Sequence, residues 1–175
     1  MAAIRRTVTA LTATVLVSTV AAAPGSASAK ACATGWGSLP KAATATPSRI
    51  PNATTGRHAC YDRFVVTLGA TAGGYDVRYV GNVHTEGGGF VIPLAGGAKL
   101  QAVVRSPARV GYPARVGARL PGVSLSGYRT FRDAKYGGSF EGYTTFGIGT
   151  RARLPFRVFT MKSPARIVVD VAHKW

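Results

Sequence analysis

The sequence predicts an all-β fold: an antiparallel sandwich of two sheets with about seven or eight short strands and an irregular N-terminal arm held by a disulfide. From Tyr61 onward, β-rich runs alternate with glycine clusters, and helical periodicity is nearly absent. Two cysteines precede or adjoin the first of these runs. The chain has 175 residues, enough for one domain of ordinary size, and its 46% hydrophobic content excludes disorder throughout.

Residues 1–29 are typical of a secretory signal peptide. A basic pair, Arg5-Arg6, precedes an uncharged stretch, and the small residues Ala27 and Ala29 fit the A-x-A pattern of a cleavage site. We expect cleavage before Lys30 and Sec export, although the arginine pair leaves twin-arginine export open. The apolar stretch is short for a bilayer span, so we expect no stable membrane span after cleavage, with a retained anchor as the alternative. The predicted location is extracellular, either in the medium or at the cell wall.

Residues 30–60 are predicted to form the irregular arm, because they contain scattered prolines and little periodicity. An exported chain meets an oxidising compartment, which favours a disulfide between Cys32 and Cys60. Closing a loop of this length stabilises the fold by about 3.5 kcal/mol on a chain-entropy estimate. Two cysteines alone do not make a metal site, and no metal is predicted.

Residues 61–175 are predicted to form the β domain. Glycine clusters between the runs supply turn positions, and Pro93 places the third run at a sheet edge. The predicted strands are Phe64–Leu68, Tyr75–Val80, Phe90–Leu94, Leu100–Arg105, Phe140–Ile148, Phe156–Thr160 and Arg166–Val171.

The first and last of these runs share the pattern R-Φ-V-V-x-Φ, where Φ is apolar. Consecutive valines between apolar residues suit a strand that is buried on both faces or nearly so. The shared pattern suggests that the domain consists of two related halves, and chance similarity is the alternative.

The segment from Arg105 to Lys135 carries seven basic residues against one acid, Asp133. Guanidinium groups form paired hydrogen bonds with carboxylate or phosphate, and interleaved tyrosines could stack on a sugar or base. The alternative is a solvated, mobile loop that keeps the protein soluble. The candidate ligand-binding residues are Arg105, Arg109, Arg115, Arg119, Arg129, Arg132, Tyr112 and Tyr128.

Anionic cell-wall polymer is the expected partner. Removal of residues 1–29 takes away two arginines and no acid, so 20 basic residues face 6 acidic ones and the net charge stays at +14. Nucleic acid is physically compatible with such charge but is not expected as a partner of an exported protein.

No catalytic residues and no cofactor are predicted. Asp170 and His173 could form a relay only if the chain turned after Val171, because residues i and i+3 of a strand face opposite sides. Glu86 and Glu141 could form a glycosidase pair only at a separation that sequence does not supply.

Several segments, taken in order, resemble a known family. They are Tyr61-Asp62-Arg63-Phe64-Val65-Val66, Gly74-Tyr75-Asp76-Val77-Arg78-Tyr79-Val80, Phe140-Glu141-Gly142, Thr145-Phe146-Gly147-Ile148-Gly149, Pro155-Phe156-Arg157-Val158-Phe159 and Pro164-Ala165-Arg166-Ile167-Val168-Val169-Asp170-Val171. Together they resemble the AMIN-like domain of secreted actinobacterial proteins, a relative of the AMIN domain that accompanies cell-wall amidases.

The resemblance implies a β-rich module that holds exported proteins at the septum or wall by contacting peptidoglycan. The family-motif residues are Phe146, Phe156, Arg157, Arg166 and Asp170, which the residue types themselves assign mostly to core or turns. Arg166 and Asp170 share a strand face, where a structural ion pair or hydrogen bonds to loops is the ordinary role. We do not expect amidase activity, because a zinc amidase's ligand set cannot be assembled from these residues.

The leading hypothesis is therefore a secreted, non-catalytic module that associates with anionic wall material. The alternatives are a small hydrolase of wall glycans or peptides and an interaction domain for another exported protein.

Overall fold

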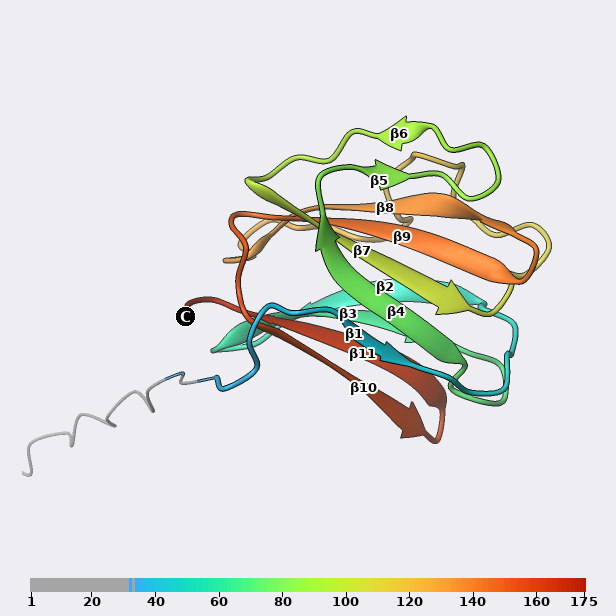
Figure 1. The fold of residues 1–175 in the computed structure, drawn as a ribbon, viewed down its shortest axis with the longest axis horizontal. Coiled ribbons are helices and arrows are strands. Elements are labelled where there is room, and N and C mark those ends of the chain that lie inside the picture. The colour runs from blue at the N-terminus through green and yellow to red at the C-terminus, as the bar shows by residue number, and fades with distance from the viewer. Residues whose placement is uncertain (1–31, 33) are drawn as a thin grey trace, which may run out of the picture. The chain divides into compact units, whose positions relative to one another are not determined.

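The structure is a computed structural model that describes residue 32 and residues 34–175. The predicted signal peptide and its cleavage site lie outside the described residues. Two antiparallel sheets pack face to face, as Figure 1 shows, which confirms the predicted sandwich. A helix that could span a membrane is not found in the described part of the chain.

The larger sheet has five strands in the order β1-β4-β7-β9-β8, and each pairs antiparallel with its neighbour. Side chains alternate along these strands, so that Val77, Leu100 and Phe146 point into the sandwich. The strands are β1 (Lys41–Ala43), β4 (Gly74–Val80), β7 (Ala98–Arg105), β8 (Phe131–Phe140) and β9 (Tyr143–Thr150).

The smaller sheet has four strands in the order β10-β11-β3-β2. The two segments with the R-Φ-V-V-x-Φ pattern are its central strands, and Arg63 lies opposite Asp170 across them. β11 is buried along almost its whole length, whereas β3 alternates between buried and half-buried positions. The strands are β2 (Asn52–Arg57), β3 (Tyr61–Thr67), β10 (Phe156–Lys162) and β11 (Ala165–Ala172).

A third, two-stranded sheet of β5 (Val83–His84) and β6 (Val91–Ile92) lies beyond the outer face of the larger sheet (Figure 1). The chain that follows it approaches β9 closely. A Cβ on Gly149 would collide with the carbonyl oxygen of Ala95, so only glycine fits there.

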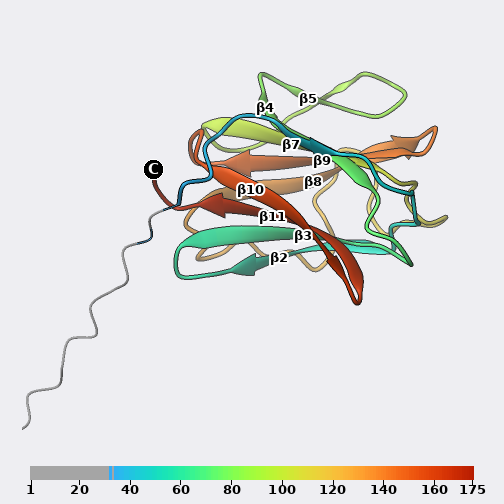
Figure 2. The same ribbon diagram turned by 60° about the horizontal axis from the view of Figure 1, so that its bottom comes forward.

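The N-terminal arm bridges the edges of the two sheets on one side of the sandwich (Figure 2). β1 pairs with β4, while the Gly37 carbonyl accepts a hydrogen bond of 2.9 Å from the backbone N–H of Phe156 in β10. The predicted disulfide between Cys32 and Cys60 is present and ties the start of the arm to the body.

Several strand predictions need correction. The arm is less irregular than expected, because it contains β1 and β2, and β2 is a full member of the smaller sheet. The predicted strand Phe140–Ile148 is wrong in its first part: Glu141 and Gly142 form a tight turn with positive φ angles of 47° and 82°, and β9 starts only at Tyr143. β8 was not predicted as a strand, and the predicted strand Phe90–Leu94 shortens to β6.

Candidate functional site

The basic connection, defined as residues 105–132, closes the side of the sandwich next to β2 and β8, opposite the side crossed by residues 34–43 of the arm. Its backbone forms hydrogen bonds beside each sheet. Arg109 N–H donates to the carbonyl of Ile50, just before β2 (3.0 Å), and Leu120 N–H donates to the carbonyl of Ala134 in β8 (3.1 Å). Leu120 is buried, and Val123 and Leu125 pack on the same core. The connection is therefore anchored to the core by its apolar side chains and to its neighbours by backbone hydrogen bonds.

The arginines of the basic connection point outward, because the apolar side chains of the connection fill the space between β2 and β8. All six candidates are exposed: Arg105, Arg109, Arg115, Arg119, Arg129 and Arg132.

Two of the six arginines have structural partners. Arg119 Nε donates to Asp133 Oδ1 (3.2 Å), although its side chain remains 72% exposed. Arg132 donates to the carbonyls of Tyr128, Arg129 and Phe131, which fixes the end of the connection. Within the described residues, the side chains of the other four donate no hydrogen bond and form no ion pair. These four guanidinium groups are available to a ligand.

The two candidate tyrosines pack inward. The Tyr112 ring lies 4.5 Å from the Tyr136 ring, and burial raises the pKa of Tyr112 well above its ordinary value. Tyr128 donates to Thr55 Oγ1 (2.9 Å), and its ring stacks 6.1 Å from Phe131. The sequence alone suggested rings that stack on a ligand, whereas in the structure these rings mainly seal the core.

Three shallow hollows lie along the connection, and each contains an arginine. One is bordered by Arg109 and Tyr112, the next by Arg119 and Arg132, and the third by Arg57 and Arg129. Residues 121–129 contribute to all three, so the hollows follow one another along a single stretch of chain. This arrangement suits an extended anionic ligand better than a small enclosed one.

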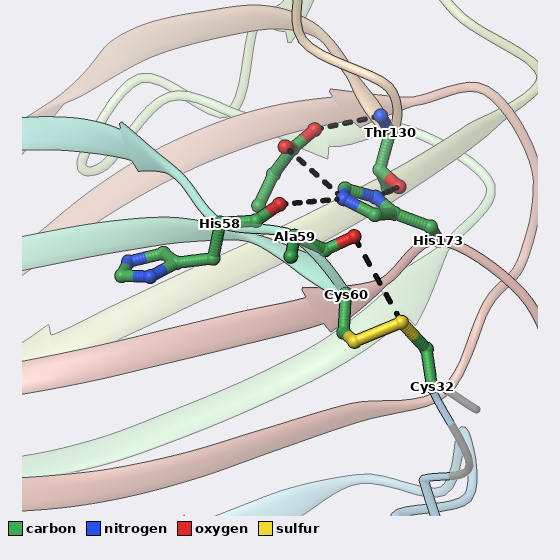
Figure 3. The surroundings of a disulfide bond; sticks show 7 residues. Cys32, His58, Ala59, Cys60, Thr130 and His173 are labelled. Atoms are coloured by element: carbon green, nitrogen blue, oxygen red, sulfur yellow. Dashed lines mark hydrogen bonds and ion pairs between the residues drawn. A yellow bond between two sulfur atoms is a disulfide. The ribbon is translucent and has the colours of Figure 1, made fainter. Parts of the chain in front are cut away.

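The third hollow lies beside the disulfide, where the connection meets β3 and the C-terminal end of β11. Figure 3 shows His173 between Thr130 and the carbonyl of His58; its ring nitrogens lie 3.0 Å from Thr130 Oγ1 and 3.0 Å from that carbonyl oxygen. Asp62 is buried and accepts backbone hydrogen bonds from Thr130 (2.6 Å) and Phe131 (2.9 Å). These contacts hold the C-terminal end of the basic connection in place.

The two catalytic alternatives find no support in these contacts. Both oxygens of Asp170 accept hydrogen bonds from arginines, and His173 faces Thr130 and a carbonyl, so the two do not form a hydrogen-bonded relay. Glu86 accepts a hydrogen bond from Thr145 Oγ1 (2.5 Å), whereas Glu141 occupies the exposed β8–β9 turn. No cluster of metal-ligating side chains is found among the described residues.

The family-motif residues separate into core and surface. Phe146 and Phe156 are fully buried in the core, as their residue types suggested. A structural ion pair or hydrogen bonds to loops was the expected role of Arg166 and Asp170, and Asp170 does form ion pairs, but not with Arg166. It pairs instead with Arg63 of β3 (2.6 Å) and Arg157 of β10 (2.8 Å), because these lie directly across from it in the sheet register.

Arg166 lies four residues away from Asp170 in β11, opposite Met161 and Thr67, and within the described residues its side chain donates only to Met161 Sδ (3.8 Å). Sequence reasoning missed four residues around Asp170, namely Trp36, Tyr61, Arg63 and Phe159. Arg63 had only a partial signal: antiparallel pairing of the two R-Φ-V-V-x-Φ segments brings it to the Asp170–Val171 end of β11, and the observed register decides that it faces Asp170.

One comparison with known proteins found a match, and it agrees with the resemblance. No curated protein and no solved structure matches the chain. A family model, described as the AMIN-like domain, matches residues 48–173. That range runs from just before β2 through β11, and so covers both sheets of the sandwich except β1, with the basic connection included. The chain therefore belongs to the AMIN-like domain family.

Proposed function

We propose that this protein is a secreted, non-catalytic binding module that associates with anionic cell-wall material through the basic connection. Membership of the AMIN-like family supports a wall-associated binding role. The observation that carries the proposal is a set of four exposed arginines on the basic connection, which is anchored to the core. Within the described residues these four have no structural partner: Arg105, Arg109, Arg115 and Arg129. Peptidoglycan or an attached polymer is the proposed ligand.

The physical reason is electrostatic. Exposed cations on a rigid support attract a polyanion without losing much loop entropy on binding, and guanidinium groups bind carboxylate or phosphate in pairs. Attraction between exposed charges is screened at a Debye length of about 8 Å at physiological ionic strength, so the association should weaken steeply as salt increases.

Sedimentation with purified wall sacculi over a salt series tests the proposal. We expect the mature protein to sediment at low salt and to be released at high salt. The triple variant Arg109→Gln, Arg115→Gln, Arg129→Gln should stay largely in the supernatant at low salt. A matched control, Arg78→Gln, Lys162→Gln, Lys174→Gln, removes the same charge from exposed positions elsewhere and should sediment nearly as the wild type.

Two results would overturn the proposal. One is a wild-type protein that remains in the supernatant at every ionic strength. The other is equal loss in both triple variants, which would show that net charge acts without the basic connection.

A further inference from the structure

A second surface, distinct from the basic connection, lies on the outer face of the smaller sheet. Asp170 in β11 is flanked by Arg63 in β3 and Arg157 in β10, all in one row across three neighbouring strands. Arg63 Nε and Nη2 donate to the two carboxylate oxygens (2.6 and 2.9 Å). Arg157 Nε and Nη2 lie 2.9 and 2.8 Å from Oδ2. One carboxylate thus orients two guanidinium groups.

Aromatic rings surround these two arginines. The Arg157 guanidinium carbon lies 4.5 Å from the centre of the Trp36 ring, 5.5 Å from Tyr61 and 5.1 Å from Phe159. Arg63 lies 5.3 Å from Tyr61 and 5.4 Å from Phe159. Such distances are within the range of cation–π attraction, so the rings and arginines hold one another in a fixed arrangement. Trp36 comes from the arm, which brings it to this face.

The charge of this cluster exceeds what a structural ion pair needs. Asp170 is fully buried and one arginine would neutralise it, yet two are present, which leaves an excess positive charge. The Arg157 side chain is 41% exposed and the Arg63 side chain 23% exposed. The Nη1 group of each arginine makes no hydrogen bond within the described part of the chain. An oriented cation with a spare donor therefore lies at the surface beside half-buried rings.

We propose that this surface binds an anionic sugar, a pyranose that carries a carboxylate or phosphate. The sugar's apolar face packs against the ring surfaces of Trp36 and Phe159, and its anionic group accepts hydrogen bonds from the Nη1 donors of Arg63 and Arg157. This site adds selectivity for one unit of a polymer to the salt-sensitive attraction of the basic connection. It rests on the proposed function for its wall setting, but none of its residues belongs to that connection.

Tryptophan fluorescence gives a direct test, because the chain contains only two tryptophans, Trp36 and Trp175. In a Trp175→Phe background, Trp36 alone reports on the site. The probes are methyl glucuronide, glucose 6-phosphate and methyl glucoside, titrated at constant ionic strength with acetate as a control anion. We expect a saturable change in Trp36 emission with at least one charged sugar, and binding at least tenfold weaker with methyl glucoside and acetate.

Variants locate the binding. Arg157→Gln should weaken binding of the charged sugar at least tenfold, whereas Arg166→Gln, which removes a charge from the same sheet face away from the rings, should change it less than twofold. Arg157→Lys keeps the charge without the planar fork and should fall between them. Thermal unfolding of each variant separates lost binding from lost folding, because Arg63 still pairs with Asp170 when Arg157 is changed.

The proposal is overturned if neither charged sugar gives a saturable signal, if acetate or methyl glucoside binds equally well, or if Arg166→Gln weakens binding as much as Arg157→Gln. Sedimentation with sacculi reports on the basic connection separately. Salt-dependent sedimentation without binding of either charged sugar would support the proposed function and contradict this site. Binding of a charged sugar without sedimentation would support this site and contradict the proposed function.

Discussion

At the scale of single residues, buried polar groups decide how firmly the basic connection is held. Asp62 is 1% exposed and accepts two backbone hydrogen bonds at the point where the connection enters β8. Removing the carboxylate leaves two buried N–H donors without a partner. We expect Asp62→Ala to lower the free energy of unfolding by about 3 kcal/mol, measured by urea titration.

The matched control for this prediction is Asp76→Ala, which removes a more exposed carboxylate paired with Arg78 on the same protein. Asp76 accepts from the half-exposed Arg78 side chain and, within the described residues, from no backbone N–H, so its removal leaves no buried donor unpaired and the effect should stay below about 1 kcal/mol. If the Asp62 variant lost no more stability than this control, the connection would not depend on its buried anchor.

Buried tyrosines make stability depend on pH in the alkaline range. Burial raises the pKa of Tyr79, Tyr112 and Tyr136, because the phenolate is poorly solvated in the folded state. The unfolded chain releases these protons near the ordinary pKa of about 10, so their contribution is fully present below that pH and is lost as pH rises above it. Urea midpoints measured from pH 8 to pH 11 should therefore fall steeply beyond pH 10.

Tyr112→Phe should reduce that alkaline slope, because the variant has one fewer buried phenol to ionise. An unchanged slope would show that Tyr112 is as accessible to solvent in the folded state as in the unfolded one. Its ring would then again be a candidate for stacking on a ligand.

At the scale of elements, the close approach of residues 93–97 to β9 depends on glycine. A Cβ at position 149 would collide with the Ala95 backbone, which has little room to move because Ala95 N–H also donates to the buried Asp133 (3.3 Å). We expect Gly149→Ala to lower the free energy of unfolding by at least about 2 kcal/mol. Gly81→Ala has no atom within 4 Å of its Cβ and ordinary backbone angles, so it should change stability by less than about 0.5 kcal/mol. Equal effects would contradict the packing argument.

The elements also show which parts of the fold local sequence can predict. The β-rich runs separated by glycines located β3, β4, β7, β10 and β11, and the two cysteines indicated their own pairing. β8 was not predicted because charged residues and glycines interrupt its apolar residues. Its Asp133 is buried although it is an acid, because Arg119 and Lys135 compensate its charge. The Glu141-Gly142 turn escaped because a non-glycine residue occupies its first positive-φ position.

The candidate surfaces were predictable to different degrees for the same reason. The basic connection is continuous in sequence, so its six arginines could be named without a structure. The cluster around Asp170 is assembled from the arm, β3, β10 and β11, and only strand register brings Arg63 and Arg157 to the same carboxylate. The arm's path, which places Trp36 beside Arg157, has no local signal in the sequence.

At the scale of the whole sandwich, the two open sides are closed by different means: the basic connection packs apolar side chains into one, and the arm crosses the other under the constraint of a disulfide. The arm contributes few buried apolar side chains, so its position depends strongly on the Cys32–Cys60 bond. We expect the double variant Cys32→Ser, Cys60→Ser to unfold with a free energy lower by up to about 3.5 kcal/mol, the chain-entropy value for a loop of this length.

The same double variant should change the surroundings of Trp36 more than those of the core, because release of the arm uncovers the rings around Arg157. In the Trp175→Phe background, quenching of Trp36 by iodide or acrylamide should increase in the double variant under conditions where circular dichroism still shows a folded sandwich. If quenching and unfolding free energy both stayed at their wild-type values, β1 pairing and the Gly37 contact with β10 would be sufficient to hold the arm. A loss of stability without a change in quenching would mean that the disulfide acts on the unfolded chain alone, and that the aromatic cluster keeps Trp36 in place without it.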